Sequence, residues 1–159
     1  MAIPFVPVQG MVLMCNFETG FVPPEMTKTR HVVVVSLLHS RDTGSCLVVP
    51  ISTQAPGRVQ PYHFRIPANK YSFFKVNTDV WAKADTLSHV SFGRLDRVLD
   101  GKKWCSPSLI PSDFKGVQAS VLQALGCPIV SSQVIETKGI VTSVVESPKI
   151  VLDAIDQSG

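Results

Sequence analysis

The chain has 159 residues, of which 45% are hydrophobic and 17% charged, and its net charge is +3. This length suits one domain, and so apolar a composition excludes an intrinsically disordered chain. The mild positive charge indicates only weakly a polyanionic partner. The four cysteines form no C-x-x-C pair, and Cys15 and Cys46 lie within apolar runs. We therefore expect these two to be reduced core residues rather than metal ligands or disulfide partners.

The N-terminus reads Met-Ala-Ile-Pro-Phe-Val-Pro, with no basic start and no long apolar stretch. This pattern is unlike a signal peptide. No apolar run approaches the roughly 20 residues that a membrane-spanning helix needs. We therefore predict a cytoplasmic protein that does not act at a membrane.

Short β-branched runs separated by turn residues make up the first part of the chain. A strand is predicted over 11–17, after Gly10, and a loop over 18–29. The runs 32–35 and 47–49 flank a polar turn at 40–44 and predict an antiparallel hairpin. In such a hairpin the start of one strand lies beside the end of the other. Arg30 should therefore lie near Ser52 and Thr53.

Further strands are predicted over 62–66 and 80–85, with 87–92 continuing or bending from the second. Asp100 and Gly101 predict a hairpin turn within 97–105. A helix follows Pro111, with Ser112 as its N-cap and Gly126 as its end. Its apolar residues recur at helical spacing and should pack on the sheet: Phe114, Val117, Val121, Leu122 and Leu125.

Many short strands followed by one helix predict a mainly β fold. We expect a small, strongly bent antiparallel sheet or open barrel with the helix against it. Residues 1–126 would form this domain. Residues 127–159 would form a C-terminal extension packed on the same domain.

Several common chemistries find no support in the sequence. The four histidines show neither H-x-x-x-H nor H-E-x-x-H spacing, and G-x-S-x-G, P-loop and G-x-G-x-x-G motifs are absent. We therefore expect no metal and no cofactor. No cysteine lies in an obvious turn, although this does not exclude a cysteine nucleophile.

Arg30 with Ser52 and Thr53 is a candidate anion site, because arginine offers two parallel donors to a phosphate. The alternative is that Arg30 covers the sheet end while the hydroxyls cap a strand. Lys83 and Asp85, two apart in a predicted strand, should share one face. They are either a solvated strand edge or a second acid–base and phosphate-contact group.

Four segments, taken in order, resemble the PemK/MazF family of bacterial toxins. They are Gly10 with its strand, Lys28-Thr29-Arg30 before 32–36, the run 49–53, and Trp81-Ala82-Lys83-Ala84-Asp85. The resemblance covers roughly residues 5–126. It implies an SH3-like antiparallel β-barrel with a C-terminal helix, usually as a homodimer. It also implies a type II toxin–antitoxin pair, with a cognate antitoxin as partner.

The resemblance implies metal-independent, sequence-selective cleavage of single-stranded RNA. The ribose 2′-hydroxyl would attack the adjacent phosphate, leaving 2′,3′-cyclic phosphate and 5′-hydroxyl ends. Arg30 would be proton donor or transition-state clamp. The family's other site residues fall on Thr53, Ser52, Glu25 and Asp85. RNA contacts are predicted for Lys28, His31, Gln54, Arg58 and Lys83.

The chain departs from the family pattern in three places. His31 stands where the family usually has proline, and it could act in acid–base chemistry or be merely tolerated. Lys83 stands where some members have arginine, which keeps the charge but loses the planar fork. The loop 56–78 is long and residues 127–159 are extra. This extension could cover the site, extend a dimer interface or replace part of the antitoxin contact.

Two other functions stay open at this point. One is a non-catalytic barrel that binds RNA or a protein, as in gyrase-poisoning toxins, although residues 155–159 lack the terminal aromatic of that class. The other is a phage-borne relative whose extension has created a new interface. Base-stacking residues cannot be chosen from the many aromatic candidates, which are Tyr62, Phe64, Tyr71, Phe73, Phe74 and Trp81.

Overall fold

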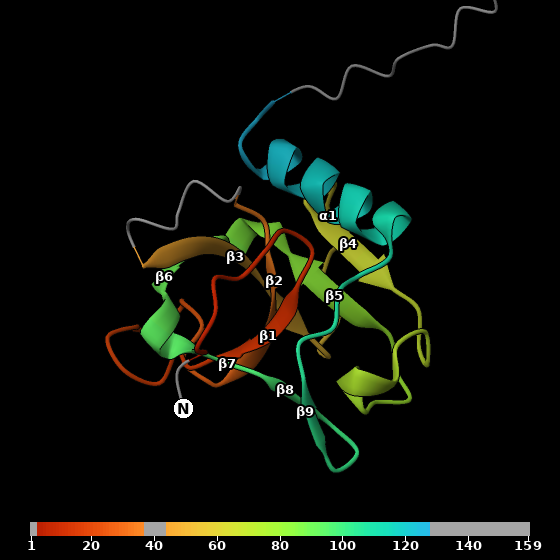
Figure 1. Ribbon diagram of the computed structural model, residues 1–159. Helices are drawn as coiled ribbons and strands as arrows, with labels where there is room; N and C mark the ends of the chain where they lie inside the picture. The colour runs from red at the N-terminus through yellow and green to blue at the C-terminus, as the bar shows by residue number, and fades with distance from the viewer. Residues whose placement is uncertain (1–2, 37–43, 128–159) are drawn as a thin grey trace, which may run out of the picture. The chain divides into compact units, whose positions relative to one another are not determined.

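The computed structural model describes residues 3–36 and 44–127 (Figure 1). These residues lie in the unit Met1–Ile129, and Val130–Gly159 forms a second unit. The polar turn at 40–43 and the predicted packing of the C-terminal extension lie outside the described residues.

The strands are β1 (Val12–Cys15), β2 (Arg30–Val34), β3 (Ser45–Ser52), β4 (His63–Ile66), β5 (Val80–Lys83), β6 (Ser88–Ser91), β7 (Leu95–Asp96), β8 (Val98–Asp100) and β9 (Lys103–Cys105). The helices are the single-turn η2 (Ser72–Phe74), η3 (Ala84–Thr86) and η4 (Phe92–Arg94), and α1 (Pro111–Ala124).

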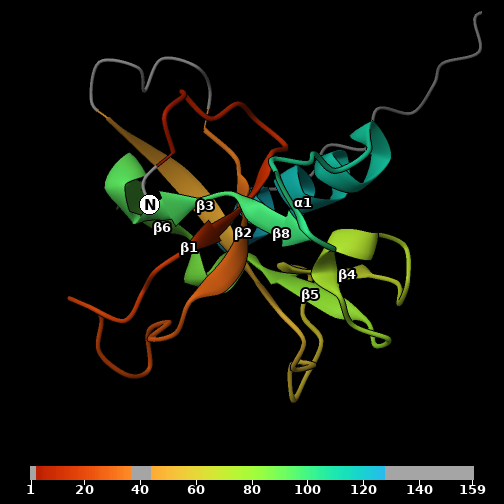
Figure 2. The same cartoon turned by 60° about the horizontal axis from the view of Figure 1, so that its bottom comes forward.

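Seven of the described strands form one antiparallel sheet in the order β4-β5-β3-β2-β1-β7, with β6 also paired to β3. The predicted hairpin is present, because Val32 pairs with Pro50 and Val34 with Val48. The first half of β3 pairs with β6, and its last two residues pair with β5. Two partners along one edge bend the sheet into an open barrel, which Figure 2 shows from a second side. The predicted fold class is therefore confirmed.

Both faces of the central strands are buried, which explains their unbroken valine run. Val33 packs in one hydrophobic cluster with Val12 and Val49, while Val32 and Val34 pack in the other. Successive side chains of a strand point to opposite faces, so a strand buried on both sides needs apolar residues at every position. The first cluster extends to α1 and η2, and the second is covered by residues near the N-terminus.

Helix α1 begins two residues earlier than predicted. Pro111 is its first residue and Ile110 is the N-cap, so the assignment of the N-cap to Ser112 was wrong. Proline suits this first position because its fixed φ is helical and the missing N–H would have no partner there. Gly126 adopts the left-handed conformation (φ +74) just beyond the helix, as a C-terminal stop requires.

Asp113, in the first turn of α1, ties the helix to the long loop that precedes β5. Its carboxylate accepts hydrogen bonds from the Lys70 ammonium and the Tyr71 hydroxyl, each at 2.7 Å. The same hydroxyl accepts the Ile110 amide N–H at 3.0 Å. Burial, with a smaller contribution from the Asp113 carboxylate, raises the pKa of Tyr71 to about 12. The cluster therefore holds the segment that carries η2 against the helix.

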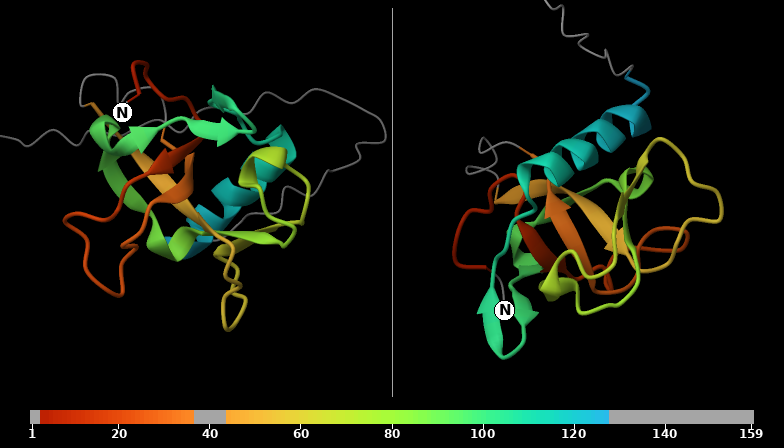
Figure 3. Two further views of the ribbon diagram at one scale, coloured as in Figure 1. Left: turned by 90° about the horizontal axis from the view of Figure 1, so that it is seen from below. Right: turned by 90° about the vertical axis from the view of Figure 1, so that its right-hand side faces the viewer.

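The apolar stripe of α1 is only partly core. Val117 is fully buried, and Phe114 and Val121 pack against the first cluster. Leu122 and Leu125, by contrast, are 44% and 62% exposed, so the expectation that they pack on the sheet was wrong. The helix packs mainly on β4 and η3 (Figure 3). In the part of the chain that the structure describes, no helix is long and apolar enough to cross a membrane.

Candidate active site

An open cavity of about 270 Å³ lies where β2 begins and β3 ends. Arg30 and His31 open β2, and Thr53 directly follows β3, and all three line the cavity. The structure thus brings Arg30 and Thr53 together, as the antiparallel register predicts. Met14 of β1 and Phe74 of η2 provide apolar walls.

The Arg30 side chain lines this cavity and has no ion-pair partner among the described residues. Its Nε is buried and has no hydrogen-bond partner. An unsatisfied buried donor costs about 1–3 kcal/mol, so it marks a place arranged for something else. Among the described residues no carboxylate forms an ion pair with Arg30. The positive charge of the guanidinium is therefore not neutralised by a described carboxylate and can attract an external phosphate or carboxylate.

His31 is set as a neutral imidazole beside Arg30. Its ring meets Phe74 edge to face, with centroids 5.2 Å apart. Burial lowers the pKa of His31; a hydrogen bond to the Phe73 backbone opposes this shift, and the nearby Lys75 charge adds to it. At neutral pH the side chain can therefore accept a proton rather than donate one.

The two hydroxyl groups at the end of β3 have different environments. Thr53 is exposed and lines the cavity, whereas Ser52 is only 3% exposed. The Ser52 hydroxyl accepts the Gln54 amide N–H at 3.1 Å. Ser52 thus stabilises the turn after β3, as in the alternative in which the hydroxyls cap a strand.

Glu25 and Asp85 line a different cavity, of about 420 Å³, with Phe21, Met26 and Leu87. The Glu25 carboxylate accepts the Val22 amide N–H at 2.7 Å within its own loop. Asp85 lies 3.6 Å from His63 Nε2 and is 42% exposed. These two residues line the same cavity, and neither is among the residues that line the Arg30 cavity.

The expectation that Lys83 and Asp85 share one face of a strand was wrong. Strand β5 ends at Lys83, and Asp85 belongs to the turn η3, so the alternation of a strand does not reach it. Lys83 is half-buried and pairs with His63 across the sheet. The rule for strands fails here because the turn η3 interrupts the extended chain between β5 and β6, which both run antiparallel to β3.

Three of the other predicted RNA contacts are exposed loop residues, namely Lys28, Gln54 and Arg58. The aromatic candidates for base stacking are mostly structural. Phe73 and Phe74 are buried core residues, and Phe64 packs against the first cluster. The sequence alone does not show whether an aromatic ring will be buried or exposed.

Two cysteines of the sheet are inert thiols. Burial raises the pKa of Cys15 to about 12 and that of Cys46 to about 11. Both lie in the second hydrophobic cluster, which confirms their prediction as reduced core residues. Across residues 3–36 and 44–127, no group of three or more histidine, cysteine, aspartate or glutamate side chains could hold a metal ion.

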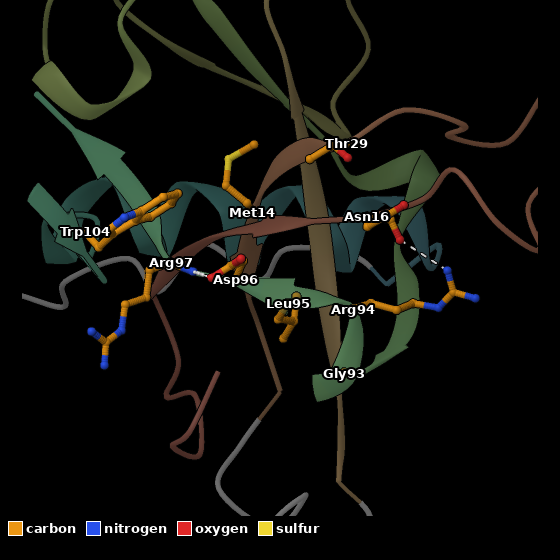
Figure 4. Close-up of a pocket in the computed structure, with 9 residues that line it drawn as sticks. All are labelled: Met14, Asn16, Thr29, Gly93, Arg94, Leu95, Asp96, Arg97 and Trp104. Carbon is orange, nitrogen blue, oxygen red and sulfur yellow. Dashed lines mark hydrogen bonds between the residues drawn. The ribbon is translucent and has the colours of Figure 1, made fainter. Parts of the chain in front are cut away.

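A larger cavity, of about 440 Å³, adjoins the first and shares Met14 and Thr29 with it. Figure 4 shows Trp104 of β9 and Asn16, just beyond β1, among its lining residues. The sequence did not predict this feature. The sequence pattern that could have predicted it is a tryptophan, Trp104, beside Lys102 and Lys103 in a short Asp-Gly hairpin. Such a hairpin offers little core in which the ring could be buried.

Residues 8–125 match the family described as "PemK-like, MazF-like toxin of type II toxin-antitoxin system". The chain belongs to this family. It is 32% identical to the protein YifN of Escherichia coli (strain K12) over 146 residues, which cover 79% of this chain and 95% of YifN.

Solved structures of the family share the fold of this chain. MazF from Deinococcus radiodurans has a TM-score of 0.56 and 21% identity, covering 77% of this chain and 98% of its own. An endoribonuclease from a mycobacterial species, in complex with its cognate antitoxin, has a TM-score of 0.54 and 18% identity, with the same coverage. At such identities the likeness shows the fold of the PemK/MazF family, and the chemistry must be argued from the site.

Proposed function

We propose that this PemK/MazF family member is the toxin of a type II toxin–antitoxin pair and a metal-independent endoribonuclease acting on single-stranded RNA in the cytoplasm. The observation that carries the proposal is the Arg30 side chain, which has no ion-pair partner among the described residues and lines an open cavity with Thr53 and His31. A fixed donor that the protein itself leaves unsatisfied suits the charge that develops on a reacting phosphate. The mycobacterial endoribonuclease named above, solved in complex with its cognate antitoxin, supports an antitoxin as partner.

The chemistry assigns one task to each side chain of the cavity. The ribose 2′-oxygen bonds to phosphorus, the bond to the 5′-oxygen breaks, and a 2′,3′-cyclic phosphate and a 5′-hydroxyl result. His31 accepts the proton of the 2′-hydroxyl, and water in the open cavity protonates the leaving oxygen. Arg30 clamps the non-bridging oxygens, since a guanidinium does not deprotonate in proteins. Thr53 adds a hydroxyl donor.

The remaining predicted residues support this centre from outside the cavity. Ser52 fixes the turn that presents Thr53. Glu25 and Asp85 line the cavity of about 420 Å³, which is formed partly by the 18–29 loop. This loop leads directly into Arg30 at the start of β2. Lys28, Gln54, Arg58 and Lys83 provide donors to the RNA backbone or bases, and the active form is a homodimer. These assignments belong to the proposal.

The test is incubation of the purified protein with a long single-stranded RNA in EDTA, followed by mapping of the product ends. We expect cuts at a defined short motif, with 2′,3′-cyclic phosphate and 5′-hydroxyl ends, because no step needs a metal ion. If the folded protein, shown by a cooperative thermal transition, leaves the RNA uncut in EDTA and in Mg²⁺, the proposal fails. A non-catalytic barrel would then be the better description.

The pH dependence of cleavage should identify His31 as the base. A base must be neutral to act, and burial lowers the pKa of His31. As the pH is lowered, kcat/KM should therefore decline with a midpoint below the ordinary histidine pKa of about 6.5. Measurement from pH 4.5 to 8 should show this limb in wild type and lose it in His31→Gln. An unchanged limb in the variant would assign the base elsewhere.

A further inference from the structure

Trp104 is an exposed tryptophan beside a cavity. It lies in β9 opposite Leu99 of β8, and it remains 55% exposed. In Figure 4 its ring extends from the hairpin toward Met14 of β1. Both residues line the cavity of about 440 Å³. A large ring left open beside an apolar floor is a surface on which a flat ligand can stack.

This stacking surface is continuous with the candidate active site. Met14 and Thr29 line both the larger cavity and the cavity that holds Arg30. A ligand that places a phosphate against Arg30 can therefore extend across Met14 into the larger cavity. A nucleotide adjoining the reacting phosphate has this form, because it carries a flat base on a phosphate chain.

The charge of the larger cavity also suits a polyanion. Arg94 and Arg97 line the cavity together with one acidic residue, Asp96. The guanidinium of Arg97 lies over the Phe5 ring and extends away from Met14 and Trp104 (Figure 4). Arg94 donates to the uncharged carbonyls of Asn16 and Thr19, at 3.2 and 2.8 Å, so its charge is not neutralised by these contacts. A further positive charge, the exposed Lys102, lies in the turn between β8 and β9.

Asn16 adds a means to read a base edge. Its side-chain carbonyl accepts the Glu18 amide N–H at 2.8 Å. This contact orients the side chain and leaves its amide N–H groups as donors. Single-stranded RNA is recognised by such a combination of a stacking ring and hydrogen-bonding groups at the edges of an unstacked base.

We infer that Trp104 and Met14 form a base-stacking subsite for a nucleotide adjoining the phosphate held at Arg30, with Asn16 at the base edge. The inference rests on the proposed function and specifies how that site selects its RNA. Trp104 was not among the aromatic residues that sequence reasoning considered. Of those, Phe73 and Phe74 are buried, so their rings are not open to a base.

The experiment separates binding from cleavage. Short 2′-O-methylated single-stranded RNA oligonucleotides lack the attacking hydroxyl, so they report binding without reaction. Affinity is measured for wild type, Trp104→Ala and Trp104→Phe, with Leu125→Ala as a control because Leu125 is also apolar and exposed. Trp104→Ala should weaken binding by about 5- to 150-fold, the range of one stacked base. Trp104→Phe and Leu125→Ala should stay within about threefold of wild type.

Cleavage and oligomeric state complete the test. In Trp104→Ala, kcat/KM on cleavable RNA should fall by a similar factor, and the base preference next to the cut should relax. Equal affinity of Trp104→Ala and wild type overturns the subsite, even if the protein cleaves RNA. If Trp104→Ala instead splits a dimer in sedimentation and leaves affinity unchanged, Trp104 belongs to an interface between copies. Binding that depends on Trp104 without any cleavage supports the subsite and contradicts only the ribonuclease proposal.

Discussion

Replacement of Arg30 by alanine should lower kcat/KM for RNA cleavage by about 100- to 1,000-fold, the loss typical of one preorganised donor to a developing oxyanion. The fold should not suffer. The Arg30 Nε is buried without a partner, so its removal relieves an unsatisfied donor. We therefore expect a midpoint of thermal unfolding equal to or slightly above that of wild type. Loss of activity with retained stability is the signature of a functional rather than structural arginine.

Two variants serve as controls for Arg30→Ala. Arg30→Lys keeps the charge but loses the planar fork, and it should recover only part of the activity. Arg65→Ala removes an arginine that already has a partner in Asp79, and it should cleave like wild type. If Arg30→Ala cleaves as well as wild type, the cavity at β2 and β3 is not the active site.

Gly116→Ala should destabilise the fold, although alanine is the better helix former. An added Cβ would overlap the Phe64 ring, closer than non-bonded carbon atoms can approach. Helix propensity alone would favour alanine by about 1 kcal/mol. Forcing α1 away from β4 should outweigh this gain and leave a net loss of about 1–3 kcal/mol. Chemical denaturation of wild type and variant measures the difference.

A double variant distinguishes the contact with Phe64 from a general effect on the helix. Phe64→Leu shortens the side chain that the new methyl meets, so Gly116→Ala should cost less in that background. Ser112→Ala, at an exposed position of the same helix, should change stability by less than about 0.5 kcal/mol. Equal or greater stability of Gly116→Ala would show that α1 lies farther from β4 than the structure places it.

Local patterns predicted the elements well because their causes are local. The runs around Val33 and Val49 form the central hairpin, since β-branched residues favour strands and both faces there are buried. Asp100 and Gly101 form the turn between β8 and β9, with Gly101 at φ +61. Pro111 and Gly126 bound the helix, although the N-cap proved to be Ile110, two residues earlier than Ser112.

The assembly of the site could be predicted only in part. The hairpin register was enough to bring Arg30 near Thr53. It could not separate Thr53 from Ser52, because the exposure of each depends on what covers the two faces of the sheet. Asp85 lies in a turn and not in a strand, since η3 interrupts the extended chain between β5 and β6, two strands that pair antiparallel with different parts of β3.

By itself, therefore, the sequence determined the strands, the helix, the family and the meeting of Arg30 with Thr53, since periodicity and strand register act over short stretches of chain. Only the tertiary structure decided which side chains remain without partners. The buried Arg30 Nε, the open ring of Trp104 and the exposed Leu125 each depend on residues distant in the chain that do or do not cover them. Burial is a property of the whole packing, and so is the chemistry that it leaves available.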